Sequence, residues 1–212
     1  MKRHIIQGTV IAGTALLLLS CIFPVKNEVE WRIRDDGSLF MRQWSYDLYS
    51  PDTSTNKALK DFIKLVEDWE PGIISETPHP DNPGNTIIVR ELQDKYGGLN
   101  SLEETVMDKT NAVELLSKIA SNGYYWLPFD TNEVSVESNG DVYDTGTPDT
   151  EILVRWPTNM TYFWYKTTQK KIKGVQLLDF WREYINAGKD IKVFESNMVY
   201  KYKIDTEVEK KK

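Results

Sequence analysis

Histidine is almost absent from this chain of 212 residues, which limits the chemistry that the sequence can support. His4 lies in an apolar N-terminal segment, which leaves His79 in the proline-rich stretch "SETPHPDNPGN". A serine hydrolase needs an imidazole that a rigid carboxylate orients, and a surface loop of this kind gives no sign of one. His79 and Asp81 are too few to hold a metal ion. We therefore expect no catalytic residue, metal or cofactor, with a His79-dependent peptidase or esterase as an alternative.

Carboxylates are abundant, and two of them could cleave a glycosidic bond without any histidine. That mechanism needs two carboxyl groups at a defined separation across a cleft, and no motif among the 32 acidic residues encodes it. Asp141, Asp144 and Asp149 cluster in "GDVYDTGTPD", but their spacing matches no calcium loop. Aspartate is common beside glycine and proline in turns. Enzymatic activity stays open, and we expect binding rather than catalysis.

Aromatic residues are the unusual feature of the chain, which has seven tryptophans. The segment "TYFWYK" puts rings on both faces of one strand, because successive side chains of a strand point in opposite directions. Rings on an open face could stack on a sugar or contact a protein partner. The strand propensity of aromatic residues favours a second interpretation, in which both faces are covered. The candidate ligand-binding aromatics are Trp156, Tyr162, Trp164 and Tyr165.

The only cysteine, Cys21, stands directly behind a run of leucines. Lys2 and Arg3 form a short basic head, and a mainly apolar run follows over residues 5–19, which is the pattern of a signal peptide. Ser20 supplies the small residue that a signal peptidase needs before the cut. An uncleaved membrane anchor is the alternative, since the apolar run up to residue 23 is about as long as the shortest spanning helices.

The tetrapeptide Leu18-Leu19-Ser20-Cys21 resembles the lipobox of bacterial lipoproteins. The resemblance implies that diacylglycerol joins the Cys21 thiol, that the signal is cut before it, and that the new amino group can carry a further chain such as palmitate. Two or more acyl chains hold a protein stably on a membrane. Ile22 in place of aspartate after the cysteine resembles the pattern for outer-membrane lipoproteins in a cell with two membranes.

The charge of the mature chain argues against nucleic acid as a partner. Of 26 basic residues, residues 1–20 hold two, so 24 remain against 32 acidic ones, a net charge of −8. Nucleic-acid binding relies on clustered lysine and arginine. The dense basic stretches are Lys170, Lys171 and Lys173 and the terminal Lys210 to Lys212, which we interpret as a solvated face or a frayed tail. After lipidation no thiol remains for a disulfide, a zinc site or a nucleophile.

Hydrophobic spacing predicts the secondary structure. Alternating apolar residues predict strands, Asp35-Asp36-Gly37 predicts the turn of a first hairpin, and Ser101 to Glu104 resembles a helix capping box. A second hairpin is expected to turn at Asn139-Gly140. The expected strands cover residues 29–34, 40–48, 86–90, 124–127, 134–142 as the second hairpin, 152–156, 161–167 and 191–204, and the expected helices 59–69, 101–119 and 175–186.

These elements predict an α+β fold, with a mainly antiparallel sheet built from hairpins and about three helices on one face. The order hairpin, helix, strand recurs in residues 28–90 and 151–204, which suggests a duplicated unit. The mature chain is long enough to bury a core without disulfides. We expect a signal peptide at 1–20, a lipidated N-terminus and tether at 21–28, one domain at 29–205 and a flexible tail at 206–212.

Attachment and composition together lead to a functional prediction. We expect a lipid-anchored protein of the cell envelope that faces outside the cytoplasm, contacts the membrane through Cys21, and binds or assembles with an envelope partner. The alternative is a carbohydrate-binding or glycoside-cleaving lipoprotein that uses surface aromatics and carboxylates.

Overall fold

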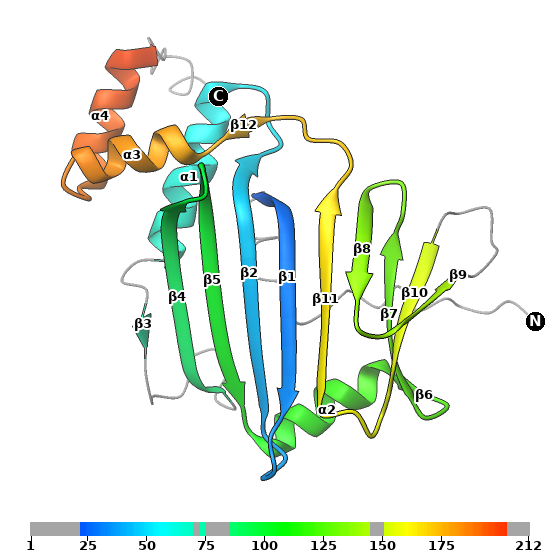
Figure 1. Cartoon of the computed structure of the whole chain (residues 1–212). Coiled ribbons are helices and arrows are strands. Elements are labelled where there is room, and N and C mark those ends of the chain that lie inside the picture. The colour runs from blue at the N-terminus through cyan, green and yellow to red at the C-terminus, as the bar shows by residue number, and fades with distance from the viewer. Residues whose placement is uncertain (1–21, 70–72, 75–84, 145–150, 203–212) are drawn as a thin grey trace, which may run out of the picture.

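The computed structural model describes residues 22–69, 73–74, 85–144 and 151–202. These residues form two sheets and four helices (Figure 1), and every strand pairing is antiparallel, so the predicted α+β class is confirmed. The expected signal peptide, Cys21, His79 and the tail at 206–212 lie outside the described residues.

The large sheet has the strand order β3-β4-β5-β2-β1-β11-β8, and β12 pairs with the end of β2. The predicted first hairpin is confirmed, because β1 pairs with β2 across the turn that contains Gly37, whose φ is +83°. The strands of this sheet are β1 (Phe23–Ile33), β2 (Leu39–Ser50), β3 (Ile73–Ile74), β4 (Asn85–Lys95), β5 (Gly98–Met107), β8 (Val134–Ser138), β11 (Tyr162–Gln169) and β12 (Val175–Gln176).

The small sheet has the order β6-β7-β10-β9 and consists of β6 (Ala120–Ser121), β7 (Tyr124–Asp130), β9 (Asp141–Asp144) and β10 (Glu151–Pro157). It packs on the large sheet through aromatic rings. The ring centroids are 5.1 Å apart for Phe129 and Tyr165, 5.6 Å for Tyr125 and Phe163, and 5.5 Å for Trp156 and Phe163. Such ring pairs contribute stability beyond the area they bury.

The helices are α1 (Thr55–Trp69), α2 (Lys109–Ile119), α3 (Leu178–Asn186) and α4 (Ile191–Tyr202). Two hydrophobic clusters lie against one face of the large sheet, which we call the covered face. One cluster joins the sheet to α1, α3 and α4, and the other joins it to α2 and the small sheet. In Figure 1, α1 and α2 pass behind the sheet. None of the described helices is long and apolar enough to cross a membrane.

Residues 101–107, where a helix start was expected, belong to β5. Ser101 pairs with Ser45 of β2 on one side and with Leu92 of β4 on the other, so the strand is held along both edges. These pairings outweigh the local capping signal. The helix α2 begins instead at Lys109, after Asp108, whose side chain accepts a hydrogen bond from the Asn111 backbone N–H.

The prediction of a final strand at 191–204 is wrong, and with it the hypothesis of a duplicated unit. Residues Ile191–Tyr202 form α4, in which Phe194 and Met198, four residues apart, are buried on one side. The strands β10 and β11 also belong to different sheets, so they form no hairpin. The third expected helix, α3, begins at Leu178 after the two residues of β12.

The predicted hairpin at 134–142 is replaced by a crossing between the two sheets. β8 pairs with β11 in the large sheet, whereas β9 pairs with β10 in the small one. The chain crosses at Asn139-Gly140. A Cβ atom on Gly140 would lie 2.5 Å from the Arg155 carbonyl oxygen, so glycine allows this approach.

The expected tether at 21–28 is replaced by the first strand. The Ile22 side chain is only 1% exposed, in the cluster with α1, α3 and α4, and β1 begins at Phe23. The described fold therefore begins at the residue that follows Cys21.

Candidate functional site

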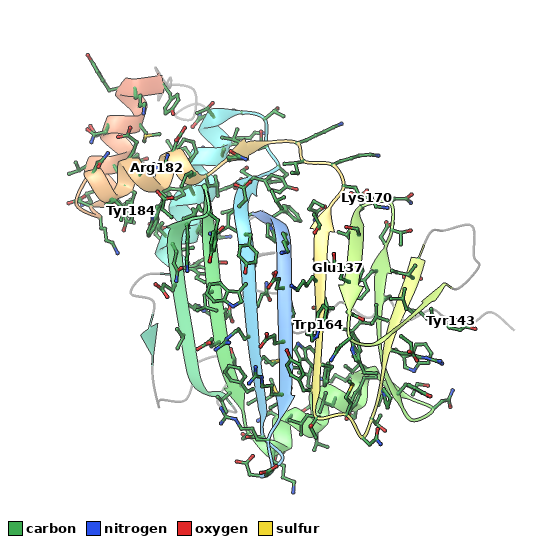
Figure 2. The ribbon with its side chains drawn as sticks, viewed as in Figure 1. Glu137, Tyr143, Trp164, Lys170, Arg182 and Tyr184 are labelled. Atoms are coloured by element: carbon green, nitrogen blue, oxygen red, sulfur yellow. The ribbon has the colours of Figure 1, made fainter. Side chains whose placement is uncertain are left out.

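The structure separates the four candidate aromatics into two pairs. Trp156 and Tyr165 belong to the core between the two sheets and are 0% and 4% exposed. Tyr162 is 37% exposed, and Trp164 is half-buried on the same face of β11 (Figure 2). The alternation within "TYFWYK" thus has one covered side and one side that meets solvent. A direct role in binding is open only to Tyr162 and Trp164 in this arrangement.

The face of the large sheet opposite the covered face, which we call the open face, carries charged and aromatic side chains. Residues directly opposite in antiparallel strands share a face. The pairing of β1 with β2 and β11 therefore assigns to the open face Lys26, Glu28, Glu30, Arg32, Phe40, Arg42, Trp44, Tyr46, Tyr162, Trp164 and Lys166. None of the described helices packs against this face, since both hydrophobic clusters draw on residues of the other one.

The charged residues of β1 form a row between two rows that contain aromatic rings. Glu28 lies opposite Trp44 of β2 and Lys166 of β11. Glu30 lies opposite Arg42 on one side and Trp164 on the other. Cross-strand neighbours are close enough for their side chains to interact, so carboxylates and rings meet within one surface.

Ion pairs organise the centre of the open face. The Glu28 carboxylate lies 2.7 Å from Lys26 Nζ and 3.3 Å from Lys166 Nζ. Partial burial alone would raise the pKa of Glu28, but the hydrogen bonds from the two lysines outweigh it and lower the pKa below its ordinary value. On the next strand pair, Arg42 contacts Glu104 at 2.5 Å. The acidic and basic groups therefore largely neutralise one another.

Cations also lie over the rings of the open face. Lys166 Nζ is 5.5 Å from the Trp164 ring centroid, and the Arg32 guanidinium is 5.1 Å from the Tyr162 ring centroid. Contacts of this kind at exposed sites contribute about 0.5–1 kcal/mol. They hold the rings in defined positions at the surface.

A second group of rings lies on β2 and beside it. Trp44 and Tyr46 are stacked with centroids 6.2 Å apart, and Tyr96 lies 6.5 Å from Tyr46. Partial burial, followed by the negative charge of Glu28, raises the pKa of the Tyr46 hydroxyl. Tyr46 therefore stays neutral and can donate a hydrogen bond at ordinary pH.

A shallow hollow of about 170 Å³ lies between β1 and β11 on the open face. Its lining combines two acidic residues, one lysine, three aromatic residues and a valine, and consists of Glu28, Val29, Glu30, Tyr162, Trp164, Tyr165 and Lys166. The volume suits a small polar group rather than a large cofactor.

The chemistry of the hollow supports binding more directly than cleavage. Carboxylates accept hydrogen bonds, the lysine donates them, and the indole offers an apolar surface. A glycosidase needs one carboxyl whose pKa is raised so that it can donate a proton, whereas the pKa of Glu28 is lowered. Among the described residues, no group of three or more histidine, cysteine, aspartate or glutamate residues could hold a metal ion.

Most of the residues that form the open face are not among the candidates predicted from the sequence. Glu28, Glu30, Trp44 and Lys166 are the main additions. A signal was available, because a hairpin register that buries Val29 places Gln43 beside it and Trp44 on the opposite face.

Comparisons with protein-family models, with curated proteins and with solved structures find no match to this chain. The fold and the site thus define the protein only as a two-sheet α+β protein with an open aromatic and charged sheet face. Function has to be argued from that face and from the N-terminal sequence.

Proposed function

We propose that this protein is a lipid-anchored member of the cell envelope, outside the cytoplasm, and that it works by binding a partner protein through the open face. The observation that carries the proposal is the open face itself, where rings and charges of both signs meet solvent on a rigid sheet. Tryptophan, tyrosine and arginine are the residues that most often dominate binding energy at protein interfaces.

Membrane attachment through Cys21 would hold the fold close to the lipid surface. The next residue, Ile22, is buried against the cluster with α1, α3 and α4, so no free tether separates the proposed anchor from the core. Acyl chains confine a protein to two dimensions and raise its effective concentration near other membrane proteins. A partner of modest affinity would therefore suffice.

Charge patterning favours a protein partner of mixed charge. Along β1, two carboxylates, Glu28 and Glu30, lie between two cations, Lys26 and Arg32, so the charges of the row balance and no strong field of one sign extends over the face. Complementary charges on a partner would fix the register of docking and exclude other surfaces.

Site-specific photo-crosslinking in native membranes tests the open face. A photo-reactive phenylalanine derivative at Tyr162 should give one discrete adduct, whereas the same group at Tyr143, 52% exposed on the small sheet, should give none. The charge reversal Glu30→Lys should abolish the adduct, and the matched reversal Glu195→Lys on α4 should leave it intact. Equal adducts at both positions, or indifference to Glu30→Lys, would refute docking at this face.

Mass spectrometry of the native protein tests the anchor. The mature chain should lack residues 1–20 and carry added acyl mass on Cys21, and a Cys21→Ser variant should be released from the membrane or stay unprocessed. A full-length, unmodified chain would contradict lipid anchoring.

A second candidate function, carbohydrate binding, is favoured by the hollow beside Trp164. A volume of about 170 Å³ suits one sugar ring, and an indole with adjacent carboxylates is suited to stacking and to accepting hydroxyl hydrogen bonds. The lining carries two carboxylates against one ammonium group, which favours a neutral or amino sugar over an acidic one.

Tryptophan fluorescence separates this candidate from the first one. Titration with glucosamine or N-acetylglucosamine oligosaccharides should give saturable quenching that Trp164→Leu removes and Trp126→Leu, on the small sheet, retains. An acidic sugar serves as the ligand control. If none of these sugars gives saturable quenching, carbohydrate binding is refuted, and the proposal of a protein interface is not affected.

A further inference from the structure

The loop between β11 and β12 carries a basic cluster at the end of the large sheet where the described chain begins. We propose that Lys171, Ile172 and Lys173 of this loop contact the headgroups of an anionic membrane and so fix the orientation of the anchored domain. The proposal rests on the proposed anchoring through Cys21.

Strand pairing places the loop close to the anchor point. Lys26 of β1 lies opposite Thr168 of β11, and the two strands are antiparallel, so the chain after Thr168 continues along the start of β1. Phe23, at that start, pairs with Tyr49 of β2. Figure 1 shows the start of β1, the end of β11 and the link to β12 at one end of the sheet, and Figure 2 labels Lys170 there. A lipid on the residue before Ile22 would bring this end to the membrane.

The loop is fixed at both of its ends. The Lys170 backbone N–H donates to the Glu133 carbonyl oxygen at 2.9 Å, and its Nζ donates to the Thr131 carbonyl oxygen. At the other end, Gly174 approaches β2 so closely that a Cβ atom would lie 1.9 Å from the Ser50 carbonyl oxygen. A loop held in this way presents its middle residues without an added cost of ordering.

The middle of the loop has the composition of a membrane contact. Ile172 is 48% exposed, and Lys171 and Lys173 on either side of it are exposed and form no ion pair within the described part of the chain. Exposed lysines are attracted to anionic headgroups, and an exposed apolar side chain can enter the interface. Lys170 is the weaker contributor, because its ammonium group already donates to Thr131.

Local charge decides the sign of the interaction although the mature chain is acidic. Charges farther away than about 8 Å are largely screened at physiological salt, so only the groups at this end count. Acidic groups are present there too, namely Asp47, Asp52, Asp61, Asp130 and Glu133. Asp47 accepts a hydrogen bond from Gln176, and Asp61 accepts one from Ser50, so the attraction to the membrane depends on the exposed Lys171 and Lys173. Asp52 forms an ion pair with Lys57 at 3.1 Å, which removes its charge from this balance.

Quenching by spin-labelled lipid tests the orientation in the full anchored chain. Because the Cys21 thiol is acylated in this proposal, an engineered cysteine is the only reactive one. A fluorophore at Thr168→Cys reports on the loop end, and one at Asp35→Cys reports on the far hairpin. Because Thr168 lies opposite Lys26, the strand rise places Asp35 about 30 Å away. The protein is reconstituted in vesicles of phosphatidylcholine alone or of an equal mixture with phosphatidylglycerol.

Quenching at the Thr168 position should be about twofold stronger in the anionic vesicles, and quenching at the Asp35 position should be weak in both. The double variant Lys171→Gln, Lys173→Gln should bring the anionic value down to the neutral one. The control pair Lys109→Gln, Lys118→Gln removes the same charge; Lys109 lies beside Gly37 at the far hairpin, and the pair should change nothing.

Two failures can be told apart. If the protein carries the acyl mass but quenching does not depend on lipid composition or on the loop variants, only the membrane contact of the loop is refuted. Absence of acyl mass on Cys21 overturns the anchoring itself, and with it this orientation.

Discussion

The two faces of the large sheet differ in composition although the same strands supply both. Along β1, Val29 and Trp31 face the core and are each 2% exposed, while Glu28 and Glu30 between them face the open side. Successive side chains of a strand point to opposite faces, so the alternation of apolar and charged residues places the two kinds on different faces. The covered face stabilises the fold by burial, and the open face is left to bind a partner.

Two glutamates show how the faces differ electrostatically. Glu28 on the open face has a lowered pKa, since two lysines outweigh its partial burial. Glu103 of β5 lies opposite Gln43, on the covered face, and its pKa is raised because desolvation there exceeds the attraction of Arg90. The pKa of a glutamate is therefore lowered by nearby lysines on the open face and raised by desolvation on the covered face.

The largest difference between the faces should appear when one tryptophan of each is removed. Trp156→Ala should lower the free energy of unfolding by about 3–5 kcal/mol, because a fully buried ring between the sheets leaves a cavity. Trp164→Ala should lower the free energy of unfolding by about 1 kcal/mol or less, since the ring is half-buried and lies between solvent and Lys166. Chemical denaturation of the full-length protein measures both.

Similar losses for the two variants would break the distinction between the faces. It would mean that the ring of Trp164 is as important to the fold as that of Trp156, and that the open face is covered in solution.

The hairpin of β1 and β2 is the part of the fold and the site that the sequence predicts best. Alternation over Val29, Trp31 and Ile33 and the turn at Gly37 predict both strands, and the pairing follows from them. Which face of β2 is covered could also be deduced, because Val29 lies opposite Gln43. Trp44 belongs to the open face, opposite Glu28.

Other elements depend on distant parts of the chain and could not be predicted locally. The β5 segment looks like a helix start and becomes a strand between β2 and β4. Residues 191–204 have β-branched and aromatic residues, but Phe194 and Met198 are buried in a cluster contributed by α1 and α3. Half of the candidate site could not be predicted either. Glu28 and Lys166 lie opposite each other only because β1 pairs with β11, and these strands are far apart in sequence.

Asn139 connects the two sheets behind the covered face, and its removal should have the next largest effect. Its Oδ1 accepts hydrogen bonds from Trp156 Nε1 at 3.0 Å and from the Trp164 backbone N–H at 2.9 Å. Asn139→Ala should cost about 1–3 kcal/mol, because the buried indole N–H loses its acceptor. Chemical denaturation measures the free energy of unfolding of Asn139→Ala. The variant Asn132→Ala, in the exposed turn before β8, serves as the control. Equal small losses would show that the crossing between the sheets does not depend on this side chain.

The partly buried acid Glu103 gives a smaller effect with a defined pH dependence. Because the pKa of Glu103 is raised, the folded protein binds this proton more tightly than the unfolded chain does, so its contribution to stability falls as pH rises from the ordinary glutamate pKa through the raised one. Glu103→Gln should therefore match the wild type below that interval and exceed it by up to about 1 kcal/mol at neutral pH. Urea unfolding at several pH values tests this, and a loss of stability at neutral pH would show that the attraction of Arg90 outweighs the desolvation of the carboxylate.

Glu28→Gln should show the opposite sign and the smallest effect. Its lowered pKa means that the carboxylate stabilises the fold fully above the ordinary glutamate pKa and loses this contribution as pH falls through the lowered value. The variant should be less stable than the wild type at neutral pH by well under 1 kcal/mol, because the group is partly solvated, and indistinguishable from it in acid. High salt should shrink the neutral-pH difference, since screening weakens the pairs with Lys26 and Lys166, whereas the Glu103 effect should survive. A Glu28 effect that salt leaves unchanged would mean that this acid, too, is shielded from solvent, and the electrostatic contrast between the faces would fail.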